Sequence, residues 1–225
     1  MAAMRRLYHS WFCPQSRKVR VALAEKGLDF MLSFEKTWER RPEFLLINPA
    51  GSVPVLVEED GSVIVDNYAV TEYLEEAYPD RPLMGTTPAA RAEIRRLMDW
   101  FDVKFQRDVT QHVVSEKVLK RFLRMGEPNS EAIRCAAHNI KIHLEYIGYL
   151  ADSRTWLGGD QFSYADIAAA AHLSVVDYLG GVPWDVNEAA KVWYMRIKSR
   201  PSVRPLLKDA IAGLRPPAHY AQLDF

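Results

Sequence analysis

The chain has 225 residues, 48% of them hydrophobic, and its 29 lysines and arginines balance its 29 aspartates and glutamates. This length and composition are typical of a globular protein with one large or two small domains, and zero net charge gives no basic excess for nucleic acid. The first residues contain no apolar run long enough for a signal peptide or a membrane span. We therefore expect a cytoplasmic protein that does not bind nucleic acid and does not insert into a membrane.

The two cysteines, Cys13 and Cys135, have neither C-x-x-C spacing nor neighbouring metal-ligand residues. Paired cysteines at regular spacings would predict a disulfide framework or a zinc site, whereas isolated ones are typical of a reducing compartment. This usage predicts no metal site and agrees with a cytoplasmic location.

The first strand, helix and strand are expected within the first 34 residues. Residues 4–10 have the pattern of a short strand, and apolar residues then recur at helical spacing up to Gly27, which suits a helix C-terminus. Residues 28–34 return as a second strand. Two strands joined by a helix at this length are expected to pair in parallel.

A hairpin and a helix are expected to complete this region. Residues 51–57 and 62–66 flank an Asp60-Gly61 pair, which is a strong signal for a hairpin turn. Residues 67–78 then have a helical pattern that ends before prolines. The order predicts a compact mixed sheet with helices packed against it, forming a first domain over 1–82.

The rest of the chain shows helical patterns and no convincing strand. Thr87 can cap a helix that has Pro88 at its first position, and Ser163 can cap a helix that is apolar on all faces, as buried helices are. Asp166 is placed to complete a capping box with Ser163. Helices are expected over 88–124, 130–150, 164–176 and 187–200. We predict an all-helical second domain over 87–213, followed by a tail over 214–225.

Three motifs resemble those of the cytosolic glutathione transferases. The segment from Cys13 to Arg20 resembles the active-site turn and first helix of that family, and residues 48–56 match its N-P-x-G-x-V-P-x-L signature. Residues 162–167 match the F-[ST]-x-A-D-I start of a helix in its second domain. The resemblance covers essentially the whole chain and implies a thioredoxin-like α/β N-terminal domain followed by an all-α C-terminal domain. It also implies a cis peptide bond before Pro54 and pairing of the Val53 backbone with glutathione.

Three side chains near the start of the chain are candidates for catalysis. Cys13 precedes a helix, and free amides and the dipole at a helix N-terminus stabilise a thiolate. The resemblance to members with a catalytic cysteine implies thiol reductase chemistry, and Ser10 and Ser16 are alternatives for the hydroxyl that activates glutathione. Tyr8 is a weaker candidate because its strand position suits inward packing. The competing interpretation is that Cys13 is a small, unreactive residue.

Residues 66 and 67 depart from the family pattern. Glutathione-binding members usually have Glu-Ser there, whereas this chain has Asp66-Asn67. Asn67 is a good helix N-cap, so we expect the helix to persist and glutathione affinity to fall. The sequence therefore predicts a non-catalytic binding protein without a cofactor. Glutathione is expected only under the alternative, a transferase or thiol reductase.

These departures resemble a branch of the family whose members bind FtsZ, the bacterial tubulin homologue. The resemblance implies a cytoplasmic homodimer at the division site, an adaptor that binds FtsZ filaments and promotes constriction. Trp38 lies in a charged loop and is interpreted either as a lid over the ligand cleft or as an anchor at a partner interface. The run that contains Lys117, Lys120 and Arg121 is either a solvated helix face or a second contact with FtsZ.

The tail has two interpretations as well. Its last residues, Leu223, Asp224 and Phe225, combine apolar and acidic side chains after a pair of prolines. One interpretation is a segment packed on the protein's own surface, because tails are often ordered only when docked. The other is a linear motif for a further division partner, such as a regulator of cell-wall synthesis.

Overall fold

The computed structural model describes residues 4–225. The chain divides into a first unit that ends at Leu83 and a second unit, Met84–Phe225. The first unit contains all four strands that form the sheet, and the second is built of helices. The predicted fold class, a mixed α/β domain followed by a helical domain, is confirmed.

The sheet has the strand order β2-β1-β3-β4. β1 and β2 pair in parallel, as predicted for two strands joined by a helix, while β3 is antiparallel to both β1 and β4. Each strand is shorter than its sequence pattern predicted, although flanking residues still form cross-strand backbone hydrogen bonds, such as that from the Glu35 amide to the His9 carbonyl. The strands are β1 (Arg6–His9), β2 (Met31–Phe34), β3 (Val55–Val57) and β4 (Val63–Val65).

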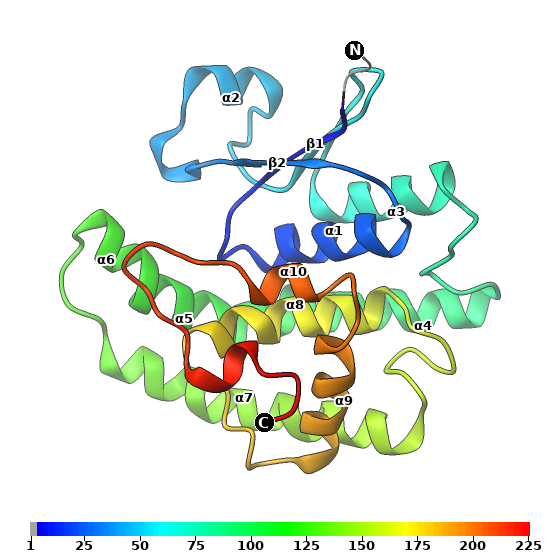
Figure 1. Ribbon diagram of the computed structural model, residues 1–225. Helices are drawn as coiled ribbons and strands as arrows, with labels where there is room; N and C mark the ends of the chain where they lie inside the picture. The colour runs from blue at the N-terminus through cyan, green and yellow to red at the C-terminus, as the bar shows by residue number, and fades with distance from the viewer. Residues whose placement is uncertain (1–3) are drawn as a thin grey trace. The chain divides into compact units, whose positions relative to one another are not determined.

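Helices cover both faces of this sheet. α1 (Pro14–Glu25) and α3 (Asn67–Ala77) pack against each other on one face, and the short α2 (Pro42–Ile47) lies on the other (Figure 1). The apolar side of α1 is fully buried, and Gly27 takes the left-handed conformation (φ 70°) just beyond its end. Glycine adopts this conformation without strain, so the predicted helix end is confirmed.

The second unit begins with one continuous helical rod from Pro88 to Leu123. Thr87 caps it by accepting a hydrogen bond from the Ala90 amide, as predicted. Two stretches of the rod are π-helical, with the Gln111 amide, for example, bonded to the Gln106 carbonyl. The stretches are α4 (Pro88–Asp99), η2 (Trp100–Thr110), α5 (Gln111–Val114), η3 (Ser115–Leu119) and α6 (Lys120–Leu123).

The core of the second unit is α8 (Tyr164–Tyr178), whose 15 residues are all buried. It packs against α4, η2 and α9, and Figure 1 shows it running through the middle of this unit. The predicted capping box of Ser163 and Asp166 is present. The remaining helices are α7 (Ser130–Ser153), α9 (Glu188–Lys198), α10 (Arg204–Leu207) and the 3-10 turn η4 (Ala218–Ala221).

Candidate functional site

The sheet topology brings the predicted glutathione-site residues to one edge. Cys13 follows the end of β1, Val53 and Pro54 precede β3, and Asp66 directly follows β4. Because β3 is antiparallel to both β1 and β4, with Val55 opposite Tyr8 and Val65, these three chain segments emerge at the same end of the sheet. The peptide bond between Val53 and Pro54 is cis, as the resemblance implied.

The Cys13 thiol lies at the N-terminus of α1, where it is half-buried. Its Sγ accepts a hydrogen bond from the Ser16 amide at 3.4 Å, so the sulfur acts as the N-cap of the helix. As a donor, the thiol has the Val53 carbonyl at 3.5 Å and the Gln15 Oε1 at 3.4 Å. A thiol has one proton and serves one acceptor at a time. Cys13 therefore has an amide donor for a thiolate and two acceptors for a thiol.

The two candidate serines differ in accessibility. The Ser16 side chain is completely buried, and its Oγ accepts a long hydrogen bond of 3.4 Å from the Ser10 amide. Ser10 itself is half-buried, and its carbonyl accepts a hydrogen bond from the Cys13 amide. Ser16 thus serves the turn that leads into α1, and of the two hydroxyls that of Ser10 is the more accessible. Tyr8 packs its ring against Phe44, 5.4 Å between centroids, in agreement with inward packing.

The prediction that Asn67 caps the following helix is wrong. Asp66 is the N-cap of α3: its Oδ1 accepts a hydrogen bond of 2.8 Å from the Tyr68 amide, and Asn67 is the first helical residue. The backbone of Asp66, with φ 76° and ψ 138°, is not helical, so the helix begins at Asn67 and Asp66 occupies the cap position. Aspartate is as good an N-cap as asparagine, so sequence preference could not separate them. The Asp66 carboxylate is exposed at this edge of the sheet.

Trp38 lies in the 3-10 turn η1 (Thr37–Glu39), with 37% of its surface exposed. On either side the charged side chains pair with one another: Lys36 with Glu39 at 2.9 Å, and Arg41 with the buried Glu35 at 2.6 Å. The indole is thus an exposed apolar feature between two ion pairs, with the exposed Arg40 directly after the turn.

The three predicted cations of the second unit have different surroundings. Lys117 is half-buried and donates to the Leu179 carbonyl at 2.9 Å, and burial lowers the pKa of its ammonium. Lys120 forms an ion pair with Glu116 at 2.6 Å. Arg121 is exposed, at the start of a run of exposed residues that extends to Glu131; residues 121–125 of this run are called here the 121–125 tip. Of the three residues, Arg121 alone is exposed, whereas Lys117 and Lys120 are half-buried.

The predicted tail residues lie on the second unit. The ring of Phe225 packs against Trp184 and stacks on His219, with centroid distances of 5.3 and 5.2 Å. Asp224 is exposed and Leu223 is half-buried. This placement agrees with the packed-segment interpretation for Phe225, and it leaves Asp224 at the surface.

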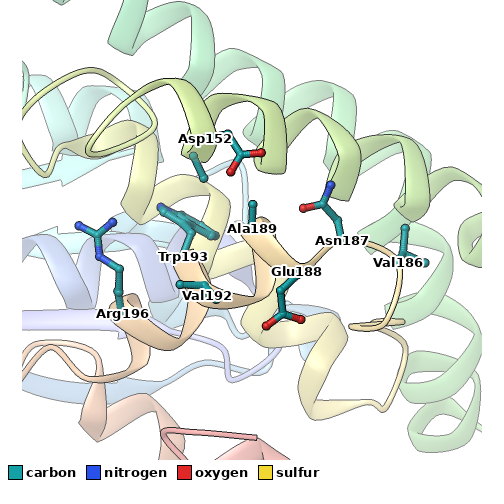
Figure 2. A pocket seen from close by; sticks show the side chains of 9 residues that line it. Asp152, Val186, Asn187, Glu188, Ala189, Val192, Trp193 and Arg196 are labelled. Carbon is teal, nitrogen blue, oxygen red and sulfur yellow. The ribbon is translucent and has the colours of Figure 1, made fainter.

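Two open cavities lie in the second unit, and none of the predicted site residues lines either of them. One of about 600 Å³ lies between the end of α7 and α9 (Figure 2), edged by the charged side chains of Asp152, Glu188 and Arg196. The other, of about 930 Å³, is formed by Tyr178 and the loop 209–216. No sequence motif indicated either of them, because they arise where segments distant in the chain meet.

Sequence reasoning also missed Gln15 and the exposed apolar residues of the 121–125 tip. Gln15 lies two positions after Cys13, and only the structure shows its amide oxygen at the thiol. Phe122 and Met125 expose 41% and 64% of their surfaces, which a helical pattern alone does not reveal.

Within residues 4–225, no group of three or more histidine, cysteine or acidic side chains is arranged to hold a metal ion. None of the helices in this range is both long enough and apolar enough to cross a membrane.

Models of known families match both units of the chain. The glutathione S-transferase N-terminal domain matches residues 12–77, and the glutathione S-transferase C-terminal domain matches residues 128–201. Each match falls within one of the two compact units.

Individual relatives match the chain over its full length. FtsZ-localized protein A of Caulobacter vibrioides is 49% identical over all of both chains. Among solved structures, a glutathione S-transferase from Rhodospirillum rubrum has a TM-score of 0.97 and 56% identity, covering 99% of this chain and 100% of its own. FzlA from C. crescentus has a TM-score of 0.96 and 49% identity with the same coverage. The chain therefore belongs to the glutathione S-transferase family.

Proposed function

We propose that this protein is an adaptor with the glutathione S-transferase fold that binds FtsZ filaments and promotes constriction of the dividing cell. The observation that carries the proposal is 49% identity, without truncation on either side, to FtsZ-localized protein A. The same degree of identity accompanies a TM-score of 0.96 to FzlA. In this proposal the protein acts in the cytoplasm, at the division site.

The sheet edge supports a binding role without catalysis. The Asp66 carboxylate places negative charge where the family pattern has glutamate followed by a serine donor for the glutathione carboxylate. Asp66 is also engaged as the α3 cap through the Tyr68 amide. A carboxylate ligand at this edge would meet the larger planar amide of Asn67 in place of a compact serine hydroxyl, beside an aspartate one methylene shorter than the glutamate of the family pattern.

Trp38 and Arg121 are the proposed contacts with FtsZ. Tryptophan and arginine are enriched among residues that dominate binding energy, and both side chains are exposed here. Lys120 lies beside Arg121 and contributes through its half-exposed ammonium, although Glu116 offsets its charge. Lys117 is the weakest of the four candidates, because its ammonium is already bonded to the Leu179 carbonyl.

The test is co-sedimentation with FtsZ polymers assembled with GTP. We expect the protein to pellet with the polymers, and we expect Trp38→Ala to lower the bound fraction severalfold, as loss of an anchor worth about 2 kcal/mol or more would. Tyr68→Ala is the matched control, since Tyr68 is an exposed aromatic side chain of the same unit. Equal pelleting of the Trp38 and Tyr68 variants would remove Trp38 from the interface, and absence of pelleting would refute FtsZ binding.

Cys13 supports a second candidate function, a glutathione-dependent transferase or thiol reductase. Its sulfur lies at the N-terminus of α1 with the Ser16 amide as donor, and the Val53 carbonyl lies beside it. Without a second cysteine in the first unit, thiol reduction of a glutathionylated substrate would pass through a mixed disulfide between Cys13 and glutathione, which releases the substrate thiol. Glutathione is the co-substrate only in this alternative.

Retention on a glutathione resin, followed by transferase and thiol-reduction assays, separates the two functions. The adaptor proposal expects weak retention and no activity that depends on Cys13. Strong retention, together with activity that is lost in Cys13→Ala and kept in Cys135→Ala, would overturn the non-catalytic part of the proposal. Cys135 is a suitable control because it is exposed and free.

The proposal includes a homodimer and a second partner. Two copies would bring two FtsZ-binding surfaces to one filament, and avidity would then strengthen binding. The tail, with Asp224 exposed, would engage a further division partner such as a regulator of cell-wall synthesis. Reversal of charge in Asp224→Lys should leave pelleting with FtsZ unchanged, whereas loss of pelleting would show that the tail serves FtsZ itself.

A further inference from the structure

The segment Ala218–Phe225, called here the 218–225 strap, is held to the second unit at two separate places. The first is Tyr220, whose side chain is completely buried and whose hydroxyl donates to the Leu206 carbonyl at 3.2 Å. Its ring also packs edge-on against Tyr178. This contact fixes the η4 turn independently of the residues that follow it.

The second place is a socket for the ring of Phe225. His219 stacks on the ring at an interplanar angle of 25°, and Trp184 and Tyr194 contact it edge-on. Two ammonium groups lie near its faces, Lys198 Nζ at 4.2 Å and Lys191 Nζ at 5.4 Å from the centroid. These five residues are the Phe225 socket, which combines stacking with cation–π attraction.

Between the two places the strap is weakly held. The last hydrogen bond along it joins the Gln222 amide to the His219 carbonyl, and within residues 4–225 none involves Leu223, Asp224 or Phe225. Asp224 is exposed, and Leu223 is half-buried. Segments with few buried contacts and no backbone hydrogen bonds open at low free-energy cost. The contacts of the Phe225 ring, together with the electrostatic attraction between Asp224 and Lys198, therefore keep residues 223–225 in place.

The socket has its own support beneath the ring. Oδ1 of the buried Asp177 accepts a hydrogen bond of 2.9 Å from Trp184 Nε1. The same oxygen lies 2.9 Å from His219 Nε2. Lys198 Nζ donates to the His219 carbonyl at 3.0 Å. None of these bonds involves Phe225, so they position the socket whether or not the ring occupies it.

We propose that Phe225 is a reversible latch, and that docking of its ring withholds the Phe225 and Leu223 side chains from a binding partner, while Asp224 stays exposed. The contact is autoinhibitory: a partner that reads the Phe225 ring binds only the released strap. Its apparent dissociation constant is the intrinsic constant divided by the released fraction. This consequence rests on the tail partner of the proposed function, whereas the latch itself rests on the contacts of the socket.

The test uses a Fab raised against the free peptide of residues 221–225, Ala-Gln-Leu-Asp-Phe, as a probe of the released strap. We expect the Fab to bind the full chain at least tenfold more weakly than it binds the peptide. His219→Gln removes the stacked ring and keeps an amide able to donate to Asp177, and it should strengthen Fab binding about two- to tenfold, the range for losing one aromatic pair. Lys191→Gln, on the half-exposed side of the socket, should act in the same direction.

Lys141→Gln is the matched control, because Lys141 is an exposed lysine on α7 outside the socket. It should leave Fab binding unchanged. Equal Fab affinity for the chain and the peptide would overturn the latch, and so would equal affinities of the unmodified chain and both socket variants.

A second measurement is independent of the Fab and of any loss of fold. In a chain with labelled phenylalanine, the Phe225 ring signals, assigned through Phe225→Leu, should be displaced from random-coil positions by the neighbouring rings. They should move toward those positions in His219→Gln while the signals of the buried Phe101 and Phe105 stay in place. Random-coil signals in the unmodified chain would overturn the latch. FtsZ pelleting tests the proposed function separately, so a negative result for FtsZ binding would not contradict the latch, and a negative result for the latch would not contradict FtsZ binding.

Discussion

Asp66 is a residue whose conformation matters as much as its chemistry. Its φ of 76° lies in the left-handed region, which residues other than glycine, asparagine and aspartate rarely adopt. This backbone places Oδ1 on the Tyr68 amide and begins α3. The same residue therefore stores strain, caps a helix and puts a negative charge on the sheet edge.

Substitutions at Asp66 should separate the cap from the strain. Asp66→Ala loses the cap and keeps the unfavourable φ, so the free energy of unfolding should fall by about 1–2 kcal/mol. Asp66→Gly loses the same cap but relieves the backbone, and should cost only about a few tenths of a kcal/mol. Urea unfolding of both variants checks this. Equal destabilisation would mean that the left-handed backbone carries no cost.

At the scale of elements, α7 and α9 meet closely because residue 148 has no side chain. A Cβ on Gly148 would overlap the amide of Asn187, which caps α9 by accepting a hydrogen bond from Ala190. Gly148 lies inside α7, where glycine is otherwise unfavourable by about 1 kcal/mol relative to alanine. Close packing against the cap of a neighbouring helix accounts for its presence.

Gly148→Ala should therefore destabilise the protein in spite of its better helix propensity. We expect a net loss of about 1–3 kcal/mol from overpacking. In an Asn187→Ser background, the smaller side chain keeps a capping oxygen and leaves room for the methyl group, so the loss should shrink. A double-mutant cycle measured by urea unfolding checks the coupling. Additive effects of the two substitutions would show that the overlap relaxes elsewhere.

A buried histidine joins α7 to the long helical rod. His143 Nδ1 accepts a hydrogen bond of 3.1 Å from Trp100 Nε1, and Phe105 packs on its ring. Burial lowers the pKa of His143 to about 4, although Asp108 at 3.6 Å opposes the shift. The folded state therefore binds fewer protons at His143 than the unfolded state does between about pH 6.5 and pH 4.

This depressed pKa predicts acid sensitivity. Stability from His143 is complete above pH 6.5 and is lost as the pH falls toward 4, by about 3 kcal/mol for a shift of this size. His143→Gln keeps an acceptor for Trp100 and does not titrate, so the stability difference between the two chains should narrow or reverse between pH 7 and pH 4.5. The two chains must be compared at each pH because another buried group titrates in the same range. Burial raises the pKa of Asp166 to about 6, so this residue changes stability in the opposite direction as the pH falls. A difference that is independent of pH would contradict the buried neutral histidine.

At the scale of the whole molecule, the proposed adaptor depends on self-association. A dimer should sediment at about twice the chain mass of 25.8 kDa at micromolar concentration. Under conditions that dilute it to monomers, binding to FtsZ filaments should weaken more than the loss of subunits accounts for, because avidity is lost. Sedimentation equilibrium checks the first expectation. A monomer at micromolar concentration would contradict the proposed dimer.

Much of the fold was predictable because its signals are local. Thr87 and Ser163 cap their helices as predicted, since a capping side chain bonds amides only two or three residues ahead. The Asp60-Gly61 turn and the order of strands and helices followed from patterns of similarly short range. The π-helical stretches were not predicted, because an amphipathic helical pattern does not distinguish them from α-helix over a few turns.

Features of the candidate site were also predictable where their signals are local, and not predictable where they depend on distant segments. The sequence by itself determined the glutathione S-transferase architecture, the placement of Cys13 at a helix start and the departure at residues 66 and 67. Only the tertiary structure decided that Asp66 caps α3, that Lys117 is bonded to Leu179, 62 residues away, and that Phe225 lies in a socket. The physical reason is the range of the interactions. Capping and turn preferences act within a few residues, whereas burial and long-range hydrogen bonds depend on which distant segments the packed core brings together.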